Sequence, residues 1–75
     1  MSETMLDVKG LSCPLPILKA KKAIKDLATG DVLNIVATDP GSAKDFEAFC
    51  RQTGNKLLDS ALDGGVYSFK IEKVA

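Results

Sequence analysis

The sequence predicts an α+β protein in which two helices pack on one face of a four-stranded mixed sheet. Two segments with helical spacing of apolar residues are interleaved with four strand-like segments, in the order βαβαββ. Each helix buries one stripe, so both need the sheet as a shared packing surface. With 75 residues, 45% of them hydrophobic, the chain can build one small domain with one modest core. We therefore expect a two-layer α/β sandwich over residues 1–75, with residues 1–4 as a frayed tail.

The first half of the chain predicts a strand, a helix and a second strand. Met5 to Lys9 alternates apolar and polar residues like a strand, and residues 10–12 form a turn. A helix follows over about 14–28 and ends at Gly30. Residues 31–38 are apolar enough to form a central strand. The apolar positions of this helix include Leu15, Leu18, Ile24 and Leu27, and its other side carries Lys19, Lys21, Lys22 and Lys25.

A second helix is predicted to begin near Asp39 or Ser42, either of which can cap it. Asp45 follows Ser42 at the spacing of a capping box, although aspartate replaces the preferred glutamate. Gly54 and Asn55 end the helix. Its inner stripe consists of Phe46, Phe49, Cys50 and Thr53.

The C-terminal segment predicts a hairpin, with strands over 56–62 and 66–74 around an Asp-Gly-Gly turn at 63–65. Tyr67, Phe69 and Ile71 alternate with polar residues, which predicts one buried and one solvated side. Because no further helices are predicted, the second sheet face must be solvated or covered by a partner.

Cys13-Pro14-Leu15-Pro16 places a thiol where a helix is predicted to begin. Proline suits a first helical turn because the N–H groups there have no intrahelical partner. Free N–H groups and the positive end of the helix dipole stabilise an anion. We therefore expect Cys13 to have a lowered pKa and to react as a thiolate. With Pro16 where a C-x-x-C oxidoreductase has its second cysteine, no local disulfide can form.

Composition excludes several classes of function. Ten basic and ten acidic residues cancel, and one Tyr with three Phe offers little for stacking on bases, so direct nucleic-acid binding is not expected. No apolar run approaches the roughly 18 residues of a membrane span, and no signal peptide is recognisable. Two cysteines and no histidine give no metal site, and no cofactor site is recognised. A reducing, cytoplasmic location follows as an expectation.

Three segments resemble the TusA-type (SirA/TusA) sulfur-carrier family: L-D-V-K-G-L-S-C-P-L-P, T-G-D-V-L and A-T-D-P-G-S-A-K-D-F. The resemblance covers about Leu6 to Val74 and includes the family's C-P-x-P motif. It implies a fold like the C-terminal domain of translation initiation factor three. It also implies that Cys13 receives sulfane sulfur as a persulfide and hands it on. Pro14 and Pro16 then form the structural part of the motif, and Gly10 supports the turn before it.

The same resemblance implies partners rather than a small-molecule substrate. The expected donor is a protein such as a cysteine desulfurase or a rhodanese, and the acceptor is a downstream protein. The pathways include tRNA thiolation, molybdenum-cofactor supply and sulfur oxidation. Such a chain takes part in sulfur transfer as a persulfide carrier and is not a conventional enzyme with a substrate pocket. Two alternatives remain open: a thiol redox regulator that uses Cys13, and a non-catalytic binding module that uses the open sheet face.

Other candidate residues have simpler structural explanations beside the functional ones. Cys50 lies on an apolar helical stripe and is expected to be a core residue. Asp39 and Asp45 are expected to be capping groups, although their loop is also expected near the motif. The lysines of the first helix are expected to form a solvated face, with docking of an acidic partner as the alternative. The candidate docking residues are Lys9, Lys19, Lys22 and Asp45.

Overall fold

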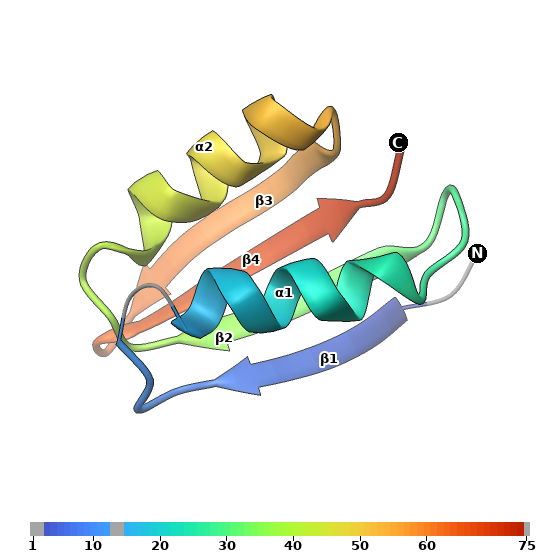
Figure 1. Ribbon diagram of the computed structural model, residues 1–75. Helices are drawn as coiled ribbons and strands as arrows, with labels where there is room; N and C mark the ends of the chain where they lie inside the picture. Colours follow the sequence, from blue (N-terminus) through green and yellow to red (C-terminus); the bar gives the residue numbers. More distant parts are fainter. Residues whose placement is uncertain (1–2, 13–14, 75) are drawn as a thin grey trace.

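The computed structural model, which describes residues 3–12 and 15–74, has two helices on one face of a four-stranded sheet (Figure 1). The predicted fold class and element order are confirmed. The elements are β1 (Glu3–Val8), α1 (Leu15–Lys25), β2 (Val32–Ala37), α2 (Ser42–Thr53), β3 (Lys56–Asp63) and β4 (Val66–Glu72).

The strand order of the sheet is β1-β2-β4-β3. β1 pairs with β2 in parallel, and β4 runs antiparallel to both of its neighbours, so the sheet is mixed as predicted. β2 is one of the two central strands, in agreement with its apolar composition. Four of its six residues are buried: Val32, Leu33, Ile35 and Ala37.

The core lies between the helices and the inner face of the sheet. Phe46 of α2 packs against Phe69 of β4, with ring centroids 4.8 Å apart. In β4, Phe69 and Ile71 are buried while Ser68 and Lys70 are exposed, which confirms the predicted alternation. The buried cluster consists of Val8, Ala20, Ile24, Leu33, Ile35, Ala37, Phe46, Phe49, Cys50, Phe69 and Ile71.

β1 begins two residues earlier than expected. Glu3 and Thr4, which were expected to belong to a frayed tail, pair with Val32 and Leu33 of β2. Glu3 also accepts a hydrogen bond from the side-chain amide of Asn34 at 3.3 Å and forms an ion pair with Lys70 at 3.7 Å. These contacts hold the start of the strand on the sheet.

The predicted end of α1 at Gly30 is wrong, because the helix ends at Lys25. Its last carbonyl groups are engaged from outside the helix: Lys73 Nζ donates to Lys25 O at 3.4 Å and to Leu27 O at 2.6 Å. Gly30 lies in the following turn with φ +96°, and its N–H donates to Lys73 O at 2.7 Å. Gly30 therefore belongs to the turn that leads into β2 and does not cap the helix.

The other two turn predictions are confirmed. Gly54 ends α2 in the left-handed region, and its N–H donates to Cys50 O at 2.9 Å. Gly64 and Gly65 join β3 to β4 with φ values of +56° and +82°. Positive φ at both central residues matches the twist of a two-residue hairpin.

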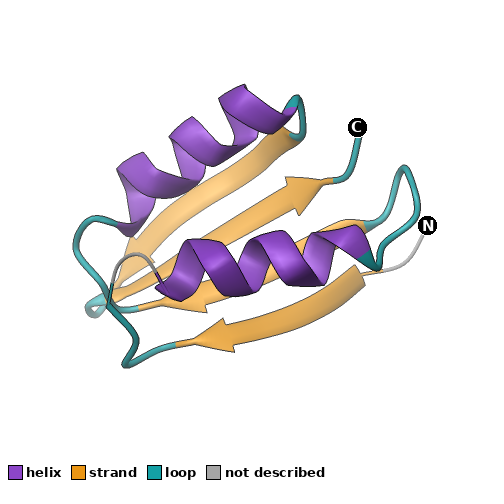
Figure 2. Cartoon of the chain, in the orientation of Figure 1, coloured by secondary structure: helices purple, strands orange, loops and turns teal. Residues whose placement is uncertain are grey.

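Both helices run antiparallel to β2, so their N-termini lie at the same end of the molecule (Figure 2). The β1–α1 loop, the β2–α2 loop and the β3–β4 turn all lie at this end, which we call the motif end. The C-terminal ends of the two helices lie at the opposite end.

Candidate functional site

The described residues frame the predicted reactive cysteine on both sides. Cys13 and Pro14 lie outside the described residues, so the exposure and chemistry of the thiol stay predictions. The chain on either side has the expected strand, turn and helix: β1 ends at Val8, and α1 begins at Leu15. The Leu15 N–H donates to Ser12 O at 3.0 Å. Leu15 and Pro16, the last two residues of the motif, are thus the first two residues of an eleven-residue helix.

Gly10 fixes the turn before the motif. It has φ +81°, a conformation that side chains with a Cβ disfavour, although no neighbour would contact a Cβ there. Its N–H donates to Thr38 Oγ1 at 2.9 Å, and the Leu11 N–H donates to Val8 O at 3.2 Å. The first bond ties the β1–α1 loop to the β2–α2 loop. The turn before Cys13 is therefore anchored to a second loop at the motif end.

Pro16 lies in the first turn of α1, where its missing N–H costs no helical hydrogen bond, and its side chain is buried. Two of the expected apolar positions of this helix are not in the core: Leu15 is 44% exposed and Leu18 is 54% exposed. The inward face instead carries Pro16, Ala20 and Ile24. Small side chains at the first two of these positions suit close packing of the helix on the sheet.

The predicted side-chain caps of α2 are wrong. Gly41 occupies the N-cap position and no side chain caps the helix. Asp39 contributes its carbonyl oxygen, which accepts from the Ser42 N–H at 3.0 Å, and the Asp45 N–H donates to Gly41 O at 3.1 Å. The Ser42 side chain is 1% exposed, and its hydroxyl has no hydrogen-bond partner among the described residues. Ser42 is therefore a buried residue in the first turn of α2 and not its cap.

Among the described residues, no ion pair joins any of the candidate docking residues to another. Lys9 is exposed and pairs with Asp7, which lies two residues before it, at 3.9 Å. Lys19 and Lys22 are exposed on α1, and no ion pair joins either of them to another described residue. Asp45 is half-buried in the first turn of α2, where its negative charge suits the helix dipole.

Cys50 is a core residue, as predicted. It is 5% exposed and belongs to the buried cluster. Burial raises the pKa of its thiol because the thiolate would lose its hydration. At neutral pH this thiol stays protonated and out of reach of other proteins, which leaves Cys13 as the candidate nucleophile.

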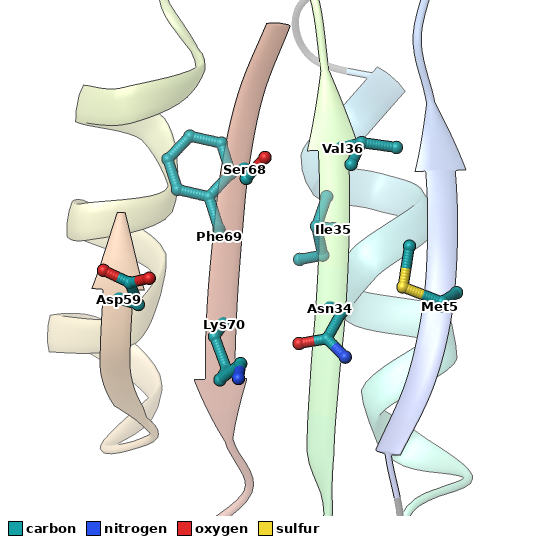
Figure 3. A pocket seen from close by; sticks show the side chains of 8 residues that line it. All are labelled: Met5, Asn34, Ile35, Val36, Asp59, Ser68, Phe69 and Lys70. Atoms are coloured by element: carbon teal, nitrogen blue, oxygen red, sulfur yellow. The ribbon is translucent and has the colours of Figure 1, made fainter. Parts of the chain in front are cut away.

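The open sheet face carries a shallow hollow of about 190 Å³ that crosses all four strands (Figure 3). Its side chains mix apolar groups such as Met5 and Val36 with the polar groups of Asn34, Asp59, Ser68 and Lys70. Among the described residues, no group of three or more His, Cys, Asp or Glu side chains could hold a metal ion. None of the described helices is both long and apolar enough to cross a membrane.

A second hollow, which the sequence analysis did not predict, lies between the C-terminal halves of α1 and α2. Its residues come from both helices, from the turn between α2 and β3, and from the segment after β4. Sequence spacing brings together Lys21, Ile24 and Lys25 on one face of a helix, but it does not reveal that Phe49 and Lys73 lie opposite them.

Comparison with known proteins agrees with the architecture and shows the family. Residues 4–73 match the family described as sulfurtransferase TusA. The chain is 56% identical over 68 residues to the sulfur carrier protein TusA of Allochromatium vinosum, covering 91% of this chain and 90% of that one. It is 54% identical over 72 residues to a putative sulfur carrier protein of Neisseria meningitidis, covering 96% and 97% of the two chains. The crystal structure of a SirA-like protein from Desulfitobacterium hafniense superposes with a TM-score of 0.81 at 25% identity over the whole of both chains.

Proposed function

Because the chain belongs to the TusA family of sulfurtransferases, we propose that it carries sulfane sulfur as a persulfide on Cys13. The observation that supports this proposal most is the match, over nine-tenths of both chains, to a relative named a sulfur carrier. The Cys-Pro-Leu-Pro motif gives that role a nucleophile, since the described helix begins two residues after Cys13.

The proposed transfer is a thiol exchange that needs no external oxidant. The Cys13 thiolate attacks the outer sulfur of a donor persulfide, a new sulfur–sulfur bond forms on Cys13, and the donor cysteine leaves as a thiolate. An acceptor thiolate then attacks the outer sulfur of the Cys13 persulfide. The sulfur–sulfur bond on Cys13 breaks, and Cys13 leaves as a thiolate. Each step moves one sulfur atom at the sulfane level, so electrons balance.

The position of Cys50 favours a carrier over a redox regulator that forms an internal disulfide. Cys50 is packed in the core, and Pro16 occupies the position of a local resolving cysteine. A persulfide on Cys13 then has no accessible thiol in its own chain to attack it. The sulfur is retained until an acceptor protein arrives.

The proposed partners follow from this chemistry. A donor that itself holds a persulfide, such as a cysteine desulfurase or a rhodanese, loads Cys13, and a downstream protein with a thiolate unloads it. We propose that this relay operates in the cytoplasm, with tRNA thiolation, molybdenum-cofactor supply and sulfur oxidation as its candidate destinations.

Mass spectrometry tests the site directly. The purified chain is incubated with a cysteine desulfurase and cysteine, and Cys13→Ser and Cys50→Ser variants are treated in parallel. We expect one added sulfur on Cys13 in the unmodified chain and in Cys50→Ser, and none in Cys13→Ser. The Cys50→Ser variant should lose about 1 kcal/mol of stability, because it places a hydroxyl in the core. Equal loss of the added sulfur in both folded variants would contradict a single carrier site.

A further inference from the structure

A groove lies between the C-terminal halves of α1 and α2, at the end of the molecule opposite the motif. Its volume is about 320 Å³. Ile24 and Phe49, which are buried members of the core, form its apolar part. The groove is lined by Lys21, Ile24, Lys25, Phe49, Thr53, Asn55 and Lys73.

The lining carries three ammonium groups and no carboxylate. Lys73 donates to two carbonyl oxygens at the end of α1, which fixes its position without neutralising its charge. No ion pair joins Lys21 or Lys25 to another described residue, whereas Lys9, Arg51 and Lys70 each lie within 4 Å of a carboxylate. In a chain with a net charge of zero, the groove is a local concentration of positive charge.

We propose that this groove docks an acidic segment of a partner protein, with one apolar side chain of that segment inserted between Ile24 and Phe49. Carboxylates on either side of the inserted side chain would face Lys21 and Lys25. An apolar anchor surrounded by complementary charges matches the anatomy of a protein interface, in which a desolvated centre supplies affinity and charges supply orientation.

The position of the groove suits a carrier. With a rise of about 1.5 Å per residue, the groove residues Lys21 to Lys25 lie about 9 to 15 Å along α1 from its first residue, Leu15. A partner held at the groove would leave the motif end free for sulfur exchange. This inference rests on the proposed function for its biological sense, but the binding itself can be measured without sulfur.

The test uses the full chain carrying Cys13→Ser, so that thiol chemistry does not interfere. The probe is the fluorescently labelled peptide acetyl-Glu-Asp-Glu-Leu-Glu-Asp-Glu-amide, followed by fluorescence anisotropy at physiological salt. We expect Lys21→Gln with Lys25→Gln to weaken binding about tenfold through the loss of two charge pairs. Replacing the leucine of the peptide by serine should weaken it by about the same factor, through loss of the apolar anchor.

The matched control is Lys19→Gln with Lys22→Gln, which removes the same charge from the same helix outside the groove. It should change the affinity by less than about threefold, because neither side chain lines the groove and salt screens exposed charges that make no direct contact with the peptide. Equal weakening by both pairs would overturn the proposal, since net charge alone would then explain binding. Absence of probe binding at about 1 mM protein would overturn it as well.

Amide chemical shifts in the variant with all lysines intact give a second measurement that does not depend on the lysine variants. The peptide should shift the amides of Ile24, Thr53 and Asn55, and shifts confined to residues 9–12 would overturn the groove as the site. The experiments distinguish a failure of the proposed carrier function from a failure of the proposed groove. Groove binding without persulfide formation on Cys13 contradicts only the proposed carrier function, and persulfide formation without groove binding contradicts only the groove.

Discussion

At the scale of single residues, Cys50 shows how burial determines the chemistry of a thiol. The side chain lies in the core on α2, and the loss of hydration raises the pKa of the thiol. A thiol is a weak nucleophile until it ionises, so Cys50 cannot compete with an accessible thiolate near neutral pH. The two cysteines of the chain therefore divide into one candidate for chemistry and one for packing.

The raised pKa of Cys50 predicts a pH dependence of stability. Below the ordinary cysteine pKa of about 8.5, the thiol is protonated in the folded and the unfolded chain, and its full contribution to stability is present. Above that pH the unfolded chain loses the proton first, so stability falls until the pH passes the raised pKa of the folded state. We expect the stability difference between Cys13→Ser and Cys13→Ser with Cys50→Ala to shrink between about pH 7 and pH 10.

Urea unfolding at several pH values under reducing conditions measures this difference. Contributions to stability that the two chains share cancel in this comparison. A difference that stayed constant over the whole range would show that ionisation of Cys50 is not linked to folding.

At the scale of elements, the sequence predicted what local chemistry determines. Gly54 and the pair Gly64 and Gly65 adopt positive φ, so glycine is required by the turn itself and can be recognised without knowing the fold. The buried face of α1 could not be predicted in this way. Leucine is the more apolar residue, yet Leu18 is exposed and Ala20 is buried, because the face of α1 that packs inward carries positions 16, 20 and 24 and not position 18.

The candidate site was predictable in part for the same reason. A cysteine between a turn and two prolines is a local pattern, so the sequence alone makes Cys13 the candidate nucleophile, which stays a prediction. The groove between the helix ends has no local pattern. Lys21, Phe49 and Lys73 come from three separate segments, and only the packing of α1 against α2 and the path of the chain after β4 bring them together.

The side chain of Lys73 stabilises the C-terminal end of α1. Its ammonium group donates to Lys25 O and Leu27 O, where a positive charge also suits the helix dipole. We expect Lys73→Met to lower the free energy of unfolding by about 1–2 kcal/mol, since carbonyl groups lose a charged donor. Lys56→Met, at an exposed position with no ion pair among the described residues, is the matched control and should stay within about 0.5 kcal/mol. Equal effects of the two changes in urea unfolding would contradict a capping role for Lys73.

At the scale of the whole molecule, the parallel arrangement of the two helices concentrates loops and helix N-termini at the motif end (Figure 2). The exposed Leu15 and Leu18 belong to the half of α1 that begins there. Exposed leucines gain nothing from the core of their own chain, but they can be buried against a partner. A carrier that must bring its thiol to the thiol of another protein needs such a surface beside the motif.

Leu15→Gln with Leu18→Gln should therefore slow sulfur transfer from a cysteine desulfurase by about tenfold, the loss expected when roughly one leucine side chain is no longer buried in the complex. Loading from glutathione persulfide should be unchanged, because that small donor needs no protein interface. Leu58→Gln with Val74→Gln removes two exposed apolar side chains that lie away from the motif end, one in β3 and one after β4, and is the matched control. Rates followed by mass spectrometry with both donors separate docking from chemistry. Slower loading from both donors would place the leucines in the reactivity of Cys13, and an equal effect of the control pair would mean that the motif end is not the docking surface.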